Sequence, residues 1–273
     1  MTRTETDPRH AELTHLPGHW YYADLHTTDI DAATRFYVGL FGWSTADIHG
    51  GPHVYRTANV EGRAKAAITG LEQPGTPPHW FPYLYVTDID ATLARVPELG
   101  GAISSPAFDV MDMGRMAVVH DPSGAAFGLW QDFQRVTTVK GEHGSPSWYE
   151  THTTDINAVR RFFTELVGWT YEANLMGDEL VYYVASHPDQ VEPMQQQAAG
   201  LMQQTPSAAA EGAPSMWTVY FNVDDVDATA KLAAELGGTV ITGPLDIPGV
   251  GRTVSIADPQ DAIFSAMTPL PRE

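Results

Sequence analysis

The stretch Leu25-His26-Thr27-Thr28-Asp29-Ile30-Asp31-Ala32-Ala33 decides the fold, because altered copies of it return three times along the chain. The copies are Thr87-Asp88-Ile89-Asp90-Ala91, Thr154-Asp155-Ile156-Asn157-Ala158 and Asp224-Asp225-Val226-Asp227-Ala228. An aromatic-rich run precedes each copy and is typical of a β-strand. Apolar residues at helical spacing follow each copy, and glycine ends each of these segments. We therefore predict that each central Asp caps the start of a helix.

The four repeats fall into two pairs. Gly42-Trp43 returns as Gly168-Trp169, at an offset of 126 residues, whereas Asp121-Pro122 returns as Asp258-Pro259, at an offset of 137. The extra residues of the second half predict a lengthened loop between about 170 and 216. A single module of this length would bury only a marginal core. We therefore predict an α+β fold of four βαβββ modules, in which one pairs with two and three pairs with four.

These repeats set the expected domain boundaries. Residues 18–133 form the first domain, residues 134–147 a polar linker, and residues 148–273 the second domain. Residues 1–17 are polar and predict a disordered lead-in.

Composition excludes several classes of function. The 273 residues carry 15 basic and 34 acidic side chains, a net charge of −19. This balance argues against nucleic acid or an anionic membrane as a partner. No apolar run approaches the roughly 20 residues of a membrane span, and the first 17 residues lack a secretion signal. The chain has no cysteine, so disulfides and thiolate chemistry are excluded. We expect a cytoplasmic protein.

The fourfold motif, Phe36-Tyr37 with Gly42-Trp43, and the turn Asp121-Pro122-Ser123-Gly124 resemble the vicinal oxygen chelate (VOC) superfamily over about residues 18–269. That group includes glyoxalase I, extradiol dioxygenases, methylmalonyl-CoA epimerase, and fosfomycin- and bleomycin-resistance proteins. The chain is most similar to its two-lobed actinobacterial glyoxalase-like members of the hydroxylase type. The resemblance implies that each pair of modules curls into a half-open barrel around a cavity.

The resemblance also implies where a metal would be held. The family's ligand positions fall on Tyr22 and Trp148, on Phe81 and Thr218, and on Gly128 and Ser265. None of these is a histidine or a carboxylate, the donors that such divalent ions need. We therefore predict no metal site and no cofactor, with a metal held by relocated ligands as the alternative.

A carboxylate and a histidine recur two residues apart in both halves, as Asp24 with His26 and Glu150 with His152. Strand alternation puts them on the face of Tyr22 and Trp148, toward the expected cavity. Positions two apart on a strand are separated by ~7 Å, so we predict two general acid–base pairs. The alternative is structural: the carboxylates would pair with Arg115 or Arg252 or bond the linker backbone, and the histidines would be satisfied near the helix start.

Aromatic residues are the second set of candidates. We predict that a flat ligand contacts them together with one threonine, and that two arginines clamp an anionic group at the cavity rim. The alternatives are ordinary sheet core for the aromatics and salt bridges to Asp109 or Asp246 for the arginines. The predicted ligand-binding residues are Tyr22, Phe81, Tyr83, Arg115, Trp130, Trp148, Thr218, Tyr220 and Arg252.

Three functions follow from these residues. The first is a metal-independent tailoring enzyme of hydroxylase, isomerase or cyclase type, acting on an aromatic or polyketide-like metabolite. The second is a protein that binds an antibiotic-like ligand without turnover. The third is a metal-dependent lyase or dioxygenase with relocated ligands. Four modules already complete two cavities, so we expect a monomer or a homodimer.

Overall fold

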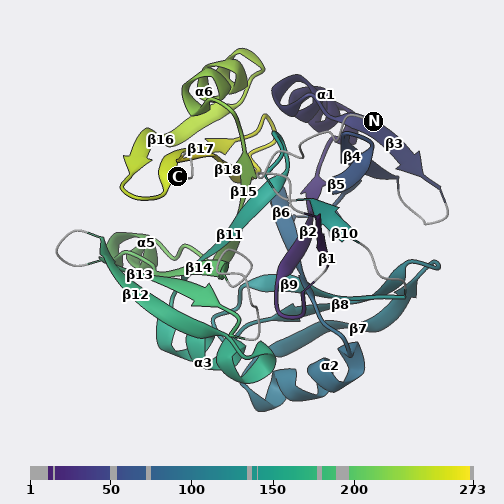
Figure 1. The fold of residues 1–273 in the computed structure, drawn as a ribbon, viewed down its shortest axis with the longest axis vertical. Coiled ribbons are helices and arrows are strands. Elements are labelled where there is room, and N and C mark those ends of the chain that lie inside the picture. The colour runs from purple at the N-terminus through teal and green to yellow at the C-terminus, as the bar shows by residue number, and fades with distance from the viewer. Residues whose placement is uncertain are drawn as a thin grey trace, which may run out of the picture.

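The computed structural model describes residues 12–14, 16–49, 54–71, 75–133, 137–139, 141–176, 180–188 and 197–270. The chain forms two curled eight-stranded sheets, each built from two consecutive βαβββ modules (Figure 1). The predicted α+β fold of paired modules in half-open barrels is therefore confirmed.

The first sheet has the strand order β3-β4-β5-β2-β6-β9-β8-β7. Its central strands β2 and β6, which open the two modules, pair antiparallel. Each pairs in parallel on its other side with the last strand of its own module, β5 or β9. The elements are β2 (Trp20–Thr27), α1 (Ile30–Phe41), β3 (Ser44–Ile48), β4 (Tyr55–Val60), β5 (Arg63–Gly70), β6 (His79–Tyr85), α2 (Ile89–Glu98), β7 (Ala102–Val110), β8 (Gly114–His120) and β9 (Ala126–Asp132).

The second sheet repeats this order as β12-β13-β14-β11-β15-β18-β17-β16. Its elements are β11 (Pro146–Thr153), α3 (Ile156–Val167), β12 (Thr170–Met176), β13 (Leu180–Ser186), β14 (Gln197–Gln203), α5 (Pro206–Ala210), β15 (Met216–Asn222), α6 (Val226–Glu235), β16 (Thr239–Ile247), β17 (Gly251–Ala257) and β18 (Ile263–Pro269). Helix α5 lies within the segment expected as a lengthened loop, and residues 189–196 of that segment lie outside the described residues.

The repeated aspartates begin the four long helices as predicted. Each accepts a hydrogen bond from the backbone N–H three residues later, at 2.9–3.0 Å. A carboxylate here satisfies an open backbone donor and complements the helix dipole. The glycines that end α1 and α3, Gly42 and Gly168, are left-handed, with φ of 69° and 80°.

A third, two-stranded sheet joins the lead-in to the linker. Strand β1 (Glu12–Thr14) pairs antiparallel with β10 (Thr137–Val139). The lead-in that we expected to be disordered thus contains a short strand at its end, while residues 1–11 and 15 lie outside the described residues. In the linker, residues 134–136 and 140 lie outside them as well, and β11 already begins at Pro146.

One hydrophobic core serves both domains. The sheets contact each other through β2 and β11 and through β6 and β15, and α1 packs near α6 while α2 packs near α3 (Figure 1). Two equivalent tryptophans tie the domains together by hydrogen bonds. Trp43 Nε1 donates to the carbonyl of Gly144 at 2.8 Å, and Trp169 Nε1 donates to the carbonyl of Gly18 at 2.6 Å. The tryptophan after α1 therefore bonds the backbone just before β11, and the tryptophan after α3 bonds the backbone just before β2.

Candidate functional site

Strand β2 separates core residues from candidate site residues by alternation. Ala23 and Leu25 are fully buried in the shared core, so Asp24 points to the opposite face. A β-bulge between Trp20 and Tyr22 changes the alternation at the start of the strand. Because of this bulge, Trp20 lies in the core between the domains, 4.4 Å from the ring of Trp217. Strand β11 has a matching bulge between Pro146 and Trp148.

Two tyrosine hydroxyls hold the carboxylate of the first domain. Asp24 is 4% exposed and accepts hydrogen bonds from Tyr55 and Tyr83, both at 2.8 Å. Burial, and then the charge of Asp24, raise the pKa of Tyr55 well above its usual value. Tyr55 therefore keeps its proton at neutral pH and remains a hydrogen-bond donor to the carboxylate.

The second domain repeats this arrangement around a longer side chain. Glu150 is 7% exposed and accepts hydrogen bonds from Tyr182 at 2.8 Å and Tyr220 at 3.0 Å. Burial and the charge of Glu150 raise the pKa of both tyrosines well above the usual value. Trp148, one of the predicted ligand contacts, donates through Nε1 to the Tyr182 hydroxyl at 2.9 Å. We call these two arrangements the tyrosine-held carboxylates.

The two histidines of the predicted acid–base pairs differ. His152 Nε2 lies 2.8 Å from Glu150 Oε1, and 43% of the His152 side-chain surface is exposed. His26 instead stacks on the ring of His79, at 5.1 Å between centroids and 11° between planes. The buried Nε2 of His26 has no hydrogen-bond partner among the described residues. Burial, and then the neighbouring His79, lower the pKa of His26 to about 4.

The predicted aromatic contacts of the first domain form a cluster of their own, apart from the shared core. Phe81, Tyr83 and Trp130 pack together, with Tyr22 against them. The Tyr22 hydroxyl donates to the carbonyl of Ala66 at 2.6 Å, and Trp130 Nε1 lies 2.5 Å from an oxygen of Asp132. In the second domain Thr218 lies directly opposite Glu150 in the strand register. Whether these residues contact a ligand remains a prediction.

The two arginines lie in salt bridges, the alternative that the sequence left open. Arg115 lies 2.5 Å from Asp90 and 3.2 Å from Asp109. Arg252 lies 2.7 Å from Asp227 and 2.9 Å from Asp246. Each guanidinium thus connects the first turn of a helix with a neighbouring strand, and both already have carboxylate partners.

The side chains at the family's metal positions do not fit a divalent ion. Tyr22, Phe81 and Gly128 occupy them in the first domain, and Trp148, Thr218 and Ser265 in the second. Across the described ranges, no three or more His, Asp or Glu side chains are grouped so that they could hold a metal. Within the same ranges, no helix is long and apolar enough to cross a bilayer.

Sequence reasoning missed Tyr55 and Tyr182, which complete the two carboxylate sites. They lie at equivalent places on β4 and β13, next to strands that pair with β2 and β11. Recurrence of a tyrosine at matching points of modules one and three was the available signal. The recurrence was hidden because the segment between the glycine that ends the helix and this tyrosine is one residue longer in module three than in module one.

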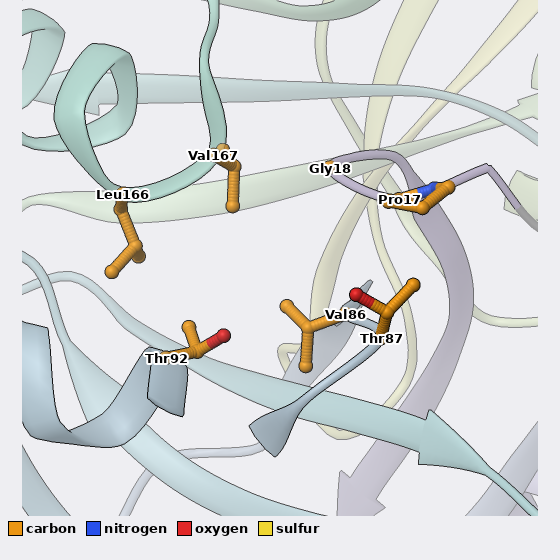
Figure 2. A pocket seen from close by; sticks show the side chains of 7 residues that line it. All are labelled: Pro17, Gly18, Val86, Thr87, Thr92, Leu166 and Val167. Carbon is orange, nitrogen blue, oxygen red and sulfur yellow. The ribbon is translucent and has the colours of Figure 1, made fainter. Parts of the chain in front are cut away.

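A separate pocket of about 130 Å³ lies where the domains meet (Figure 2). In Figure 2, Leu166 and Val167 of α3 lie on one side, and Pro17 and Gly18 on another. Val86 and Thr87 of the turn between β6 and α2, and Thr92 in the first turn of α2, complete the lining. None of the predicted site residues lines this pocket.

Both halves of the chain match known protein families. A family model described as the Glyoxalase/Bleomycin resistance protein/Dioxygenase superfamily matches residues 6–129, and one described as a glyoxalase-like domain matches residues 149–267. The chain is 39% identical over 272 residues to the "Putative glyoxylase CFP32" of Mycobacterium tuberculosis, covering 97% of this chain and 100% of the relative. It is 34% identical over 270 residues to the "Anthracycline biosynthesis protein DnrV" of Streptomyces peucetius, covering 92% and 93%.

Solved structures share the fold at low sequence identity. A Mn(II)-bound glyoxalase from Novosphingobium aromaticivorans has a TM-score of 0.65 at 15% identity, covering 95% of this chain and 84% of that one. The 2,3-dioxygenase LapB from Pseudomonas sp. KL28 has a TM-score of 0.64 at 16% identity, covering 93% and 95%. At this identity the likeness extends to the fold alone.

Proposed function

The chain belongs to the Glyoxalase/Bleomycin resistance protein/Dioxygenase superfamily, and from that premise we propose that it is an acid–base enzyme acting on a small aromatic or polyketide-like metabolite. The working pair is Glu150 and His152 of the second domain. The contact of 2.8 Å between His152 Nε2 and Glu150 Oε1 carries this proposal. The similarity to a relative named for anthracycline biosynthesis supports the ligand class.

The hydrogen bonds around Glu150 assign the protons. An ionised carboxylate only accepts, so its three bonds require donors on Tyr182, Tyr220 and His152. The raised pKa values of the tyrosines keep both hydroxyls protonated at neutral pH. In the neutral imidazole Nε2 then carries the proton, and Nδ1 carries the lone pair that accepts one from a ligand.

Glu150 acts as a positioning residue for this base. When Nδ1 takes up a proton, the imidazolium gains a charge-assisted hydrogen bond to the carboxylate beside it. The tyrosines fix the carboxylate, and the carboxylate fixes the ring and its tautomer. This is the division of labour known from other base–carboxylate pairs in enzymes.

A base of this kind suits removal of a proton from a carbon next to a carbonyl group. The C–H bond breaks, its electron pair forms an enolate, and return of the proton to another carbon completes an isomerisation. If the enolate carbon instead attacks a second carbonyl carbon, a ring closes and the new alkoxide takes the proton. Both reactions balance without an oxidant, whereas hydroxylation requires one. Isomerase or cyclase chemistry is therefore the reaction class that the pair supports most directly.

We propose that this chemistry proceeds without the metal that binds at the family's usual positions. The donors at those positions are aromatic rings, hydroxyls and a glycine, and they offer neither imidazole nor carboxylate. The tyrosine-held carboxylates lie on the same strands and occupy this face with hydrogen bonds instead.

Solvent deuterium incorporation tests the proposal. The purified chain, treated with a chelator, is incubated in D₂O with a panel of aromatic polyketides that includes anthracycline-type tetracycles, and products are analysed by mass spectrometry. Deuterium should enter the ligand with wild-type protein and fail to enter with His152→Ala. Saturable binding without exchange would replace the proposal by a binding protein without turnover. Exchange that returns only with an added divalent metal would replace it by a metal enzyme with relocated ligands.

A further inference from the structure

The pocket of Figure 2 has a counterpart elsewhere in the molecule, because the chain repeats itself. Residues 17, 18, 166 and 167 correspond to 143, 144, 40 and 41, and residues 86, 87 and 92 correspond to 223, 224 and 229. Four of the seven lining positions carry the same residue in both places. These identical pairs are Gly18 and Gly144, Val86 and Val223, Thr92 and Thr229, and Leu166 and Leu40.

At two of the three positions that differ, the pocket has the smaller side chain, and at the third it has an uncharged side chain of similar size. Pro17 stands in place of His143, Thr87 in place of Asp224, and Val167 in place of Phe41. The surrounding backbone follows the same pattern at both places. The hydroxyls of Thr92 and Thr229 both donate to the carbonyl of the helix-capping aspartate, at 2.7 Å. The open volume therefore results from Pro17 and Val167, because the backbone around both places is the same.

The counterpart shows which groups this frame accepts. His143 Nδ1 lies 3.2 Å from the backbone N–H of Asp224, which donates to it, and 3.3 Å from Oδ2 of the same residue. Thr87 has no carboxylate, so only the contact with the backbone N–H can recur in the pocket. Phe41 is 4% exposed, and its ring lies 6.4 Å from that imidazole at a plane angle of 76°. The chain thus places a nitrogen heterocycle with an acceptor, next to an aromatic ring, at the site that corresponds to the pocket.

The same backbone donor is open in the pocket. Thr87 holds the place of Asp224, and no residue in the described ranges accepts a hydrogen bond from its backbone N–H. The lining combines polar surface with the apolar side chains of Val86, Leu166 and Val167. A volume of about 130 Å³ is close to the ~150 Å³ of engineered cavities that hold one benzene molecule.

From these observations we propose that the pocket at the domain junction binds a small nitrogen heteroaromatic ring, which takes the place of the His143 imidazole and accepts a hydrogen bond from the Thr87 backbone N–H. The site lies apart from Glu150 and His152, so it does not depend on the proposed reaction. Its lining comes from both domains, and a bound ring would touch α3 of one and the β6–α2 turn of the other. Occupancy would therefore hold the two domains together.

A titration with 4-methylimidazole, the side chain of histidine, tests this site. Amide and methyl NMR spectra of the full chain should show saturable shifts at Thr87 and Val167, with a dissociation constant on the order of 1 mM for so small a ligand. Methylcyclopentane has a similar shape without the acceptor and should bind at least about tenfold more weakly. Absence of saturable shifts at Thr87 would overturn the proposal.

Two variants separate specific from incidental binding. Val167→Phe introduces the side chain that the counterpart already holds, so the protein should fold and lose 4-methylimidazole binding at Thr87. His143→Gly removes the ring from the counterpart, and 4-methylimidazole should then shift the Asp224 amide and raise the melting temperature of this variant. Unchanged Thr87 shifts in Val167→Phe, or no rescue of His143→Gly, would contradict the assignment.

Discussion

The hydroxyl of Tyr37 donates a hydrogen bond to Oδ2 of Asp258, 3.1 Å away across the domain boundary. The same hydroxyl accepts a bond from Trp80 Nε1 at 3.0 Å. At the equivalent place in the other half stands Phe163, between Trp217 and Asp121. Among the described residues, Trp217 Nε1 and Asp121 Oδ2 are both buried without a hydrogen-bond partner. One missing hydroxyl therefore leaves two polar atoms unsatisfied.

Restoring that hydroxyl should stabilise the protein. The ring contacts already match: Phe163 meets Trp217 at 5.6 Å and 89°, and Tyr37 meets Trp80 at 5.3 Å and 88°. Phe163→Tyr should raise the free energy of unfolding by about 1 kcal/mol, and Tyr37→Phe should lower it by about 1–3 kcal/mol. Urea denaturation measures both. Phe162→Tyr, at the adjacent buried phenylalanine, serves as control, and an equal gain from it would refute this explanation.

His26 should make the free energy of unfolding depend on pH. The pKa of His26 falls from 6.5 to about 4 on folding, because burial and His79 disfavour its charged form. Below pH 6.5 the unfolded chain binds a proton that the folded chain excludes, so stability should fall as pH decreases from 6.5 toward 4. The loss attributable to His26 should be at most about 3 kcal/mol. Urea denaturation of His26→Gln and of wild type at pH 7 and pH 5 measures this loss. Identical dependence of the free energy of unfolding on pH in both proteins would argue against a contribution from His26.

The two domains should unfold together. They share one core, and Trp43 and Trp169 each bond the backbone of the opposite domain. Trp169→Phe leaves the buried carbonyl of Gly18 without this donor and should cost about 1–3 kcal/mol. Near- and far-ultraviolet circular dichroism should report one coincident transition in wild type and in the variant. Two separable transitions in wild type would show that the core does not couple the domains.

The tyrosines around Glu150 should affect catalysis, whereas Tyr55 beside Asp24 should affect stability alone. Tyr182→Phe removes one bond to Glu150 and frees Trp148 Nε1, so the carboxylate holds His152 less firmly. We expect kcat for the exchange reaction to fall about tenfold with a smaller change in KM. Tyr55→Phe removes the matching bond to Asp24 and serves as the control. Equal losses of kcat in both variants would mean that the effect is not specific to the second domain.

The repeats predicted the fold because each module carries its own local signals. A capping aspartate and a glycine stop act within a few residues, so Asp29 and Gly42 could be interpreted from sequence alone. Contacts across modules were harder to predict. The bulge beside Tyr22 changes which side chain faces the core, and the sequence gives no sign of it. Simple alternation from Tyr22 would place Trp20 on the cavity face, whereas it lies between the domains.

The candidate site was predictable in type and only partly in geometry. The carboxylate and histidine two residues apart were visible in both halves, and one pair is formed. Asp24 and His26 do not form the contact seen between Glu150 and His152, because the His26 ring stacks on His79. Glutamate has one more methylene group than aspartate, and this difference in length favours contact by Glu150 rather than by Asp24. Sequence spacing alone does not encode that reach, nor the tyrosines that hold each carboxylate.

The most direct measurement compares His152→Ala with His26→Ala in the deuterium-exchange assay on the aromatic polyketide panel. Both variants lose a histidine at the same point of equivalent strands, so a general effect on the fold would appear in both. We expect His152→Ala to lower the exchange rate by about 100-fold or more and His26→Ala to retain it. Retained exchange in His152→Ala, or an equal loss in both variants, would contradict the claim that the chemistry belongs to the second domain.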